Sequence, residues 1–177
     1  SPHHLCLTEA CCVLHGPNAK MNPPLRTEAD RQAVVAGVAD GTIGVIATDH
    51  APHATEEKAA GMERAPAGIV GLEAAVALCL TELVHGGSMA LPDVVARFTR
   101  GPREVLHLEA GTLTPGAAAD VTLLDPSAQH VLHPTQFYSR SRNCPYEGRL
   151  CRGRVAGTIV DGAWVYSRLP GIAGRLR

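Results

Sequence analysis

Apolar and polar positions follow different patterns in the two parts of the chain. Through residue 109, apolar residues recur at helical spacing or form short continuous runs, which indicate helices and buried strands. From residue 110 onward, short β-rich runs alternate with turn sequences. The pattern predicts an α/β region over residues 1–109 and a small all-β unit over residues 110–177.

Three stretches of the first part predict helices. Residues 27–30, Thr-Glu-Ala-Asp, have the spacing of a capping box, and Gly41 is typical of a left-handed C-cap, so one helix is expected between them. Residues 72–85 are apolar nearly all round and predict a buried helix. Residues 92–108 predict one or two more helices, interrupted at the Gly-Pro pair 101–102.

A strand is expected over residues 42–47, Thr-Ile-Gly-Val-Ile-Ala, because this run is short, apolar and rich in β-branched residues. Such a run suits a strand that is buried on both faces of a parallel sheet. The polar sequence Thr-Asp-His-Ala-Pro-His follows directly at residues 48–53. It would lie at the carboxyl end of the strand, where parallel α/β folds carry their ligand sites.

The second part predicts short paired strands. Residues 120–124 and 154–160 are β-rich runs. An Asp-Gly pair at 161–162 separates the second run from Ala-Trp-Val-Tyr at 163–166, which is a hairpin signal.

Composition narrows the class of protein. The 177 residues are 45% hydrophobic and 19% charged, which is ordinary for a globular protein. Because the formal net charge is −1 and only 3% of the residues are aromatic, nucleic acid is not an expected partner.

The six cysteines form no Cys-x-x-Cys pair, which indicates a reduced, cytoplasmic protein. No apolar run is long enough to predict a membrane span. Because the chain begins without methionine, we expect it to be a fragment or a processed piece.

Three ionisable residues, Asp49, His50 and His53, stand within five positions after the expected strand, and Pro52 stiffens the backbone between them. A carboxylate there can ligate a metal and exchange a proton with activated water. A nearby histidine can bind a substrate carboxylate. Alternatively, Asp49 caps the next element and the histidines are surface residues. The residues alone leave both interpretations open.

Longer motifs carry a family resemblance. Thr-Asp-His-Ala-Pro-His at 48–53, preceded by Lys-Met-Asn-Pro-Pro-Leu-Arg at 20–26 and a capped helix, resembles the signature of bacterial dihydroorotases of the amidohydrolase superfamily. Further matching segments follow in the family's order, at residues 2–5, 57–58, 65–73, and 111–113 through 119–120. The resemblance covers essentially the whole chain.

The resemblance implies an α/β fold, with residues 1–109 as the C-terminal portion of a metal-dependent TIM barrel and residues 110–177 as a small β-sandwich-like domain. Asp49 would end the eighth barrel strand, ligate one of one or two zinc ions, and act as general base and acid. The implied reaction is the reversible hydrolysis of dihydroorotate to N-carbamoyl-L-aspartate, in pyrimidine biosynthesis.

The same resemblance assigns residues to the substrate. His53 matches the residue that holds the substrate carboxylate, Asn22 matches a substrate-binding asparagine, and Ala67 and Gly68 match a pair that contacts the substrate. Many relatives have phenylalanine where this chain has Ala67. For His3 and His4 a structural role is preferred, because the family's metal-binding histidines lie further upstream.

A complete barrel of this type takes about 250 residues, so only its last strand–helix units would be present. The other expected metal ligands, including a His-x-His pair, would lie upstream. We therefore expect the 177-residue chain alone to be inactive and poorly stable.

Two alternative functions remain open. One is another cyclic amidohydrolase, such as an allantoinase or hydantoinase, although these usually lack the histidine at the position of His53. The other is a non-catalytic dihydroorotase-like subunit that scaffolds aspartate carbamoyltransferase. A homo-oligomer is a further expected assembly.

Overall fold

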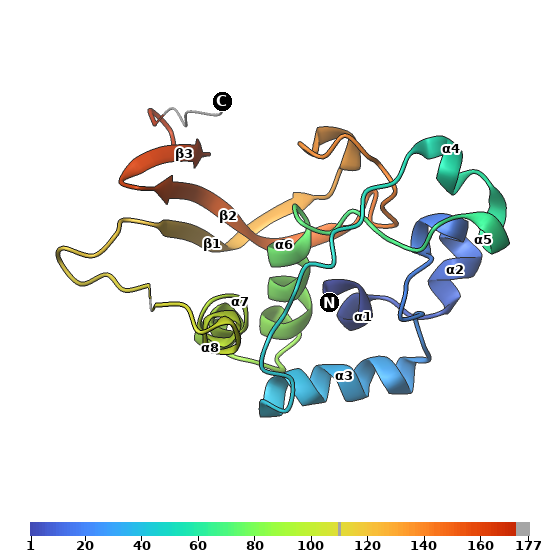
Figure 1. The fold of residues 1–177 in the computed structure, drawn as a ribbon, viewed down its shortest axis with the longest axis horizontal. Coiled ribbons are helices and arrows are strands. Elements are labelled where there is room, and N and C mark those ends of the chain that lie inside the picture. Colours follow the sequence, from blue (N-terminus) through green and yellow to red (C-terminus); the bar gives the residue numbers. More distant parts are fainter. Residues whose placement is uncertain (110, 173–177) are drawn as a thin grey trace.

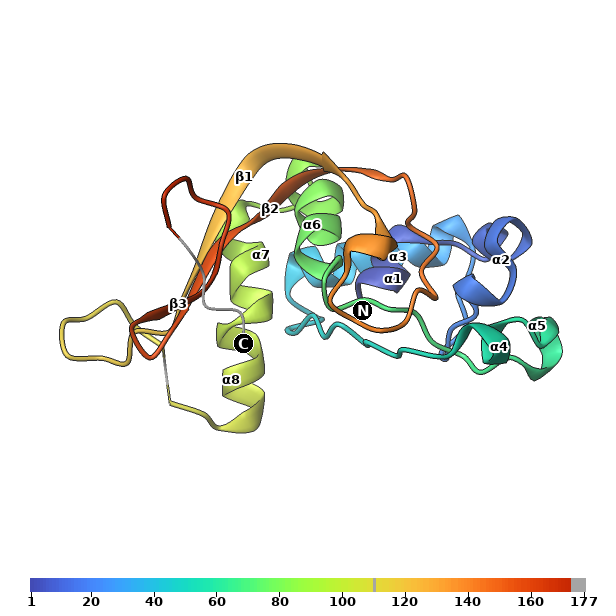
Figure 2. The same ribbon diagram turned by 90° about the horizontal axis from the view of Figure 1, so that it is seen from above.

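The computed structural model describes residues 1–109 and 111–172, in which α6 (Ala75–Cys79) packs against a curved antiparallel sheet and other helices extend to the side of it (Figures 1 and 2). The elements in chain order are α1 (Pro2–Cys6), α2 (Ala10–His15), the 3-10 helix η1 (Gly16–Ala19), α3 (Glu28–Asp40), α4 (Thr55–Lys58), α5 (Gly61–Arg64), α6 (Ala75–Cys79), the π-helix η2 (Leu80–His85), α7 (Leu91–Phe98), α8 (Arg100–Leu106), β1 (Val121–Val131), the 3-10 helix η3 (Pro134–Gln136), β2 (Leu150–Val160) and β3 (Ala163–Ser167). None of these helices combines the length and the apolar character that crossing a membrane requires.

Helix α3 has the ends that the sequence predicts. The Thr27 side chain accepts a hydrogen bond from the Asp30 amide, and the Asp30 carboxylate accepts one from the Thr27 amide, which completes the capping box. Gly41 terminates the helix in a left-handed conformation, with φ of 94°. Val38 on this helix is buried in a cluster with Leu5 of α1.

The strand predicted over residues 42–47 is not formed among the described residues. The Ile43 amide donates to the Gly37 carbonyl at 2.8 Å, and the Ile46 amide donates to the Arg97 carbonyl at 3.0 Å, so this segment bonds to helices. One isolated parallel bridge, between His50 and Ile69, lies just beyond it. A strand is defined by its neighbours, and the described part of the chain supplies none beside residues 42–47.

The predicted break at residues 101–102 lies instead at Thr99, between α7 and α8, where φ is −123° and ψ is −79°. The Gly-Pro pair falls in the first turn of α8, where proline is tolerated because its missing N–H would be unpaired there. A Cβ on Gly101 would meet the Gly44 carbonyl oxygen at 2.2 Å, so this glycine lets α8 approach the unpaired segment. The helix predicted over 72–85 is α6 continued as η2.

The second part forms one antiparallel sheet in the order β1-β2-β3, and the hairpin between β2 and β3 confirms the turn predicted at residues 161–162. The described residues do not form the two stacked layers of a sandwich. Instead α6 and η2 cover part of one face (Figure 1). There the Thr81 hydroxyl accepts from the Arg152 amide at 2.9 Å, and Gly153 leaves room for Leu80. The sheet therefore takes its cover from helices, as α6 and η2 present apolar side chains to it.

The main core crosses the division at residue 110. Residues from the β-rich part lie in one buried cluster with residues from the first part, among them Leu132, Cys144, Tyr146 and Cys151 beside Leu7, Met21, Ile69 and Leu78. The described residues on the two sides of residue 110 therefore share one core. The division into two domains at this residue stays a prediction.

His3 joins the two parts at the centre of the molecule. Its buried ring stacks on Tyr146 with centroids 5.8 Å apart, and its Nδ1 lies 2.9 Å from the Tyr146 hydroxyl. Nε2 is buried and has no hydrogen-bond partner among the described residues. Burial lowers the pKa of His3 from 6.5 to about 3, helped by the positive charge of the chain's amino group. These contacts support the structural role preferred for His3.

We expect His3 to make stability fall in acid. Because its folded pKa lies below its unfolded pKa of 6.5, the unfolded state binds a proton that the folded state does not as pH falls from 6.5 toward about 3. Stability should decline by up to about 1.4 kcal/mol per pH unit in this window. Urea unfolding of wild type and His3→Asn between pH 7 and pH 4 measures the difference. Parallel curves would contradict the assignment, and His15→Asn, at an exposed position, is the matched control.

Candidate active site

Asp49 lies at the end of the unpaired segment with its side chain exposed. Its backbone is left-handed, with φ of 51°, a conformation that aspartate tolerates better than most residues. No hydrogen bond or ion pair from the described residues engages its carboxylate. The group is therefore free to bind a cation or to exchange a proton with a ligand.

Backbone contacts with residues 69–72 hold the loop after Asp49. The Ala51 amide donates to the Ile69 carbonyl at 3.0 Å, beside the His50–Ile69 bridge. The His50 ring accepts at Nδ1 from the amides of Gly71 and Leu72, at 3.2 and 3.1 Å. His50 therefore ties the loop to the start of the α6 region, and its free ring nitrogen carries the proton.

His53 faces the segment that contains Ala67 and Gly68. Its Nε2 donates to the Ala67 carbonyl at 3.0 Å, and its Nδ1 lies 3.7 Å from the Glu57 carboxylate. In this arrangement a neutral His53 presents a lone pair at Nδ1. It can hold an anion only after protonation of Nδ1 or release of Ala67. The structure thus brings three of the predicted substrate residues together.

Gly68 makes this approach possible. Its φ is 143°, and a Cβ there would meet the Ala51 Cβ at 2.5 Å and the His53 Nε2 at 2.9 Å. Any side chain at this position would separate the two segments or distort the backbone. The role of Gly68 is therefore to permit close packing of residues 67–71 against residues 51–53.

Two lysines hold the segment that leads to Gly68. Lys58 is buried, and its ammonium donates to the carbonyl oxygens of Pro66 and Gly68, each at 2.9 Å. Burial, with a smaller contribution from the charge of Lys20, lowers the pKa of Lys58. The Lys20 ammonium donates to three further carbonyl oxygens at 2.8, 3.1 and 2.7 Å, those of Met62, Glu63 and Ala65. Backbone oxygens of this segment thus receive charge-assisted hydrogen bonds.

Asn22 is only indirectly connected to this arrangement. Its side chain is exposed on the loop 20–26, and no hydrogen bond among the described residues joins it to Asp49 or His53. The Gly68 amide donates to the Lys20 carbonyl at 2.8 Å, which ties this loop to the Gly68 segment two residues before Asn22. The role predicted for Asn22 therefore stays a prediction.

Sequence reasoning missed Asn143, which contacts the loop from the β-rich part. Its side chain is 4% exposed and hydrogen-bonds to Ala51, His53 and Gly68. These partners lie 75 to 92 residues away in the chain, so no local pattern marks the contact.

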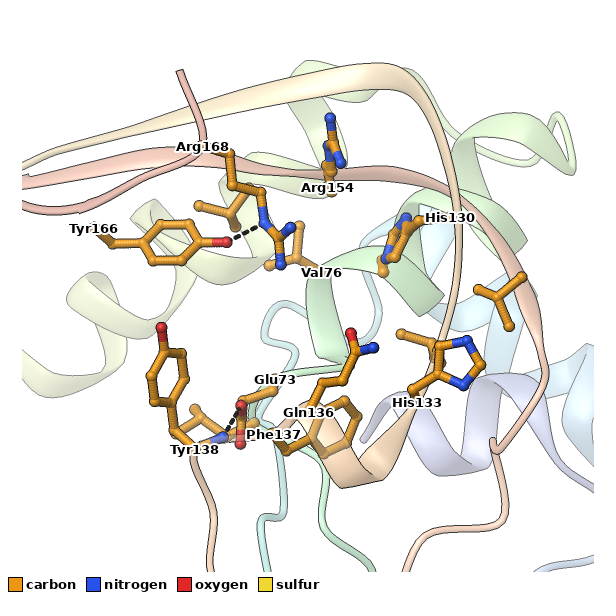
Figure 3. A pocket seen from close by; sticks show the side chains of 15 residues that line it. Glu73, Val76, His130, His133, Gln136, Phe137, Tyr138, Arg154, Tyr166 and Arg168 are labelled. Atoms are coloured by element: carbon orange, nitrogen blue, oxygen red, sulfur yellow. Dashed lines mark hydrogen bonds between the residues drawn. The ribbon is translucent and has the colours of Figure 1, made fainter. Parts of the chain in front are cut away.

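A cavity lies away from this loop (Figure 3). It has a volume of about 320 Å³ between α6, the sheet and the segment after β1, and none of the predicted site residues lines it. Arg154, Arg168 and His130 line one side, and the Glu73 carboxylate accepts hydrogen bonds from the backbone amides of Tyr138 and Ser139 on the other. We favour the Asp49 loop as the candidate site, because it unites an unengaged carboxylate with a histidine.

The described residues provide only part of a metal site. No group of three or more His, Cys, Asp or Glu side chains in the described ranges could hold a metal ion. The free carboxylate of Asp49 suits one ligand position of a zinc ion. The remaining ligands would have to come from outside this set.

We expect Gly68→Ala to destabilise the protein more than Gly61→Ala. Both glycines have positive φ, 143° and 86°, but only at Gly68 would the new methyl group clash with neighbours. Overpacking of this kind costs about 1–3 kcal/mol, and this should be the excess loss in free energy of unfolding. Urea unfolding of the two variants measures it. Equal losses would show that residues 67–71 do not pack tightly on the loop.

Comparison with known proteins identifies the family to which the chain is similar. Residues 4–165 match the family described as "Amidohydrolase family". The dihydroorotase of Shouchella clausii is 48% identical over 168 residues, which cover 95% of this chain and 39% of the relative. The dihydroorotase of Pelotomaculum thermopropionicum is 48% identical over 162 residues, covering 92% of this chain and 38% of the relative. The chain thus spans well under half the length of these relatives.

Solved structures agree in fold. The L-hydantoinase (dihydropyrimidinase) from Arthrobacter aurescens superposes with a TM-score of 0.88 at 26% identity, covering 98% of this chain and 40% of that chain. A dihydroorotase from Saccharomyces cerevisiae, in complex with 5-fluoroorotic acid, gives a TM-score of 0.70 at 20% identity, covering 96% of this chain and 43% of that chain. Together with the match over residues 4–165, these likenesses show that the chain has a mixed α/β fold and belongs to the amidohydrolase family.

Proposed function

We propose that the chain is part of a dihydroorotase, which converts L-dihydroorotate and water reversibly to N-carbamoyl-L-aspartate in pyrimidine biosynthesis. The supporting observation concerns the loop that begins with Asp49, whose carboxylate has no partner among the described residues. On this loop, His53 bonds to the Ala67 carbonyl and lies close to Gly68 of the facing segment. The 48% identity to curated dihydroorotases over 95% of the chain favours this activity within the family.

Asp49 would be the catalytic carboxylate and one ligand of a zinc site, with one or two ions. A bound zinc ion would lower the pKa of its water molecule toward neutrality, which would make the nucleophile available at neutral pH. Asp49 would take the proton of the attacking water and deliver it to the ring nitrogen as the amide bond breaks. The exposure of Asp49 and the lack of competing hydrogen bonds from the described residues suit this transfer.

His53 would hold the substrate carboxylate, and Ala67 and Gly68 would contact the substrate through backbone atoms. A protonated His53 can donate from Nδ1 while Nε2 remains bonded to Ala67, so an incoming carboxylate would compete with Glu57 for that proton. Asn22 would approach from the loop 20–26. A backbone contact at Ala67 requires no aromatic side chain, so the absence of phenylalanine there leaves this role intact.

The surrounding fold would be the C-terminal portion of a TIM barrel over residues 1–109, with a small β-domain over residues 110–177. In that fold residues 42–47 would form the eighth strand, paired with barrel strands supplied by the rest of the protein. Among the described residues no strand pairs with residues 42–47, so barrel strands from the rest of the protein could pair with this segment. We place the whole protein in the cytoplasm, with homo-oligomerisation and association with aspartate carbamoyltransferase as proposed assemblies.

A hydantoinase-like activity is the second candidate, supported by the TM-score of 0.88 to the L-hydantoinase from Arthrobacter aurescens. The two activities differ in whether the ring carries a carboxylate. The position of His53 beside Ala67 favours the carboxylate-bearing substrate, because an imidazole N–H released from the Ala67 carbonyl could donate to that carboxylate.

We expect Asp49→Asn in the whole protein to lower kcat for dihydroorotate by at least about 100-fold, since the amide cannot shuttle the proton. Spectrophotometric assay of ring opening and closure measures the rate, with zinc content determined in parallel. Asp93→Asn, at an exposed position on α7, is the matched control. Retained activity in Asp49→Asn would contradict the catalytic role, and a wild type that opens hydantoin but not dihydroorotate would favour the second candidate.

A further inference from the structure

Asn143 connects the β-rich part of the chain to the candidate site. It lies between η3 and β2, and its carboxamide uses both kinds of hydrogen-bonding atom. Oδ1 accepts from the His53 amide at 3.0 Å, and Nδ2 donates to the carbonyl oxygens of Ala51 and Gly68 at 2.9 and 3.0 Å. One side chain thus bridges the two segments that carry the proposed substrate residues.

The chemistry of these contacts requires an amide. A carboxylate of the same shape would keep an acceptor for His53 but would face two carbonyl oxygens without a donor. An apolar side chain would leave a backbone amide and two carbonyl groups without this partner in a buried setting. Asn143 also uses its own backbone, because its carbonyl accepts from the Val70 amide at 3.0 Å.

Other contacts keep the Gly68 segment attached without the carboxamide. Lys58 also donates to the Gly68 carbonyl, the Gly68 amide donates to Lys20, and the Ala51 amide donates to Ile69. None of these three contacts involves the His53 amide. That amide donates to the Asn143 carboxamide. Its loss should therefore free His53 more than it unfolds the surrounding structure.

We propose that Asn143 is a positioning residue that fixes His53 relative to Gly68, and so sets the geometry in which the substrate carboxylate is held. This inference rests on the proposed dihydroorotase function for its effect on substrate, but not for its effect on His53. It assigns to the β-rich part of the chain a direct role in substrate affinity.

The test uses the whole zinc-loaded protein with Asn143→Ala, and Asn143→Ser as a milder second variant. Amide hydrogen exchange should become about tenfold faster at His53, which loses its acceptor. Exchange at Val70 should not change, because its acceptor is the backbone carbonyl of residue 143. Thr81→Val is the matched control, since it removes a polar link between η2 and β2 remote from the loop.

The kinetic result should be a KM for dihydroorotate that rises about tenfold, with kcat changed less than about threefold and zinc content unchanged. Unchanged exchange at His53, or an unchanged KM in an active protein, would overturn the proposal. Equal acceleration at His53 and Val70 would also overturn it, because it would indicate general destabilisation. If His53 alone responds but even the wild type does not act on dihydroorotate, the positioning role stands and the proposed function fails.

Discussion

Close backbone packing between residues 49–53 and residues 67–71 is the constraint on which the candidate site depends. Gly68 has no Cβ, and the space where one would stand is occupied by the Ala51 methyl group and the His53 ring. Because the segments approach so closely, the Ala51 amide reaches Ile69 and the His53 ring reaches the Ala67 carbonyl. The site is therefore shaped by backbone as much as by side chains, while the carboxylate of Asp49 remains exposed at its rim.

The polar residues around this contact serve mainly to satisfy backbone carbonyl groups. Lys20 and Lys58 donate to five carbonyl oxygens between residues 62 and 68, and Asn143 donates to two, one of which it shares with Lys58. Buried carbonyl groups without partners are costly, so this irregular segment needs such donors to adopt one conformation. The donors come from three separate regions of the chain, which links the order of the site to the packing of the whole domain.

Local sequence signals predicted the parts whose structure is locally determined. The capping box at Thr27, the left-handed Gly41 and the Asp-Gly hairpin all depend on residues within a few positions of one another. Residues 42–47 have a strand-like composition, yet pairing depends on neighbours that the described chain does not supply. For the site, family motifs singled out His53, Ala67 and Gly68, which the structure brings together, and Asn22, which it does not join to them. Asn143 makes contacts over 75 to 92 residues and carries no local signature.

The most direct test is a crystal structure of the whole zinc-loaded protein with N-carbamoyl-L-aspartate. Binding at the Asp49 loop predicts a ligand carboxylate within hydrogen-bond distance of His53, with the ureido group beside Asp49 and the ligand against the backbone of residues 67–68. A ligand held instead by Arg154 and Arg168 in the cavity between α6 and the sheet, with the Asp49 loop empty, would contradict the assignment of the site.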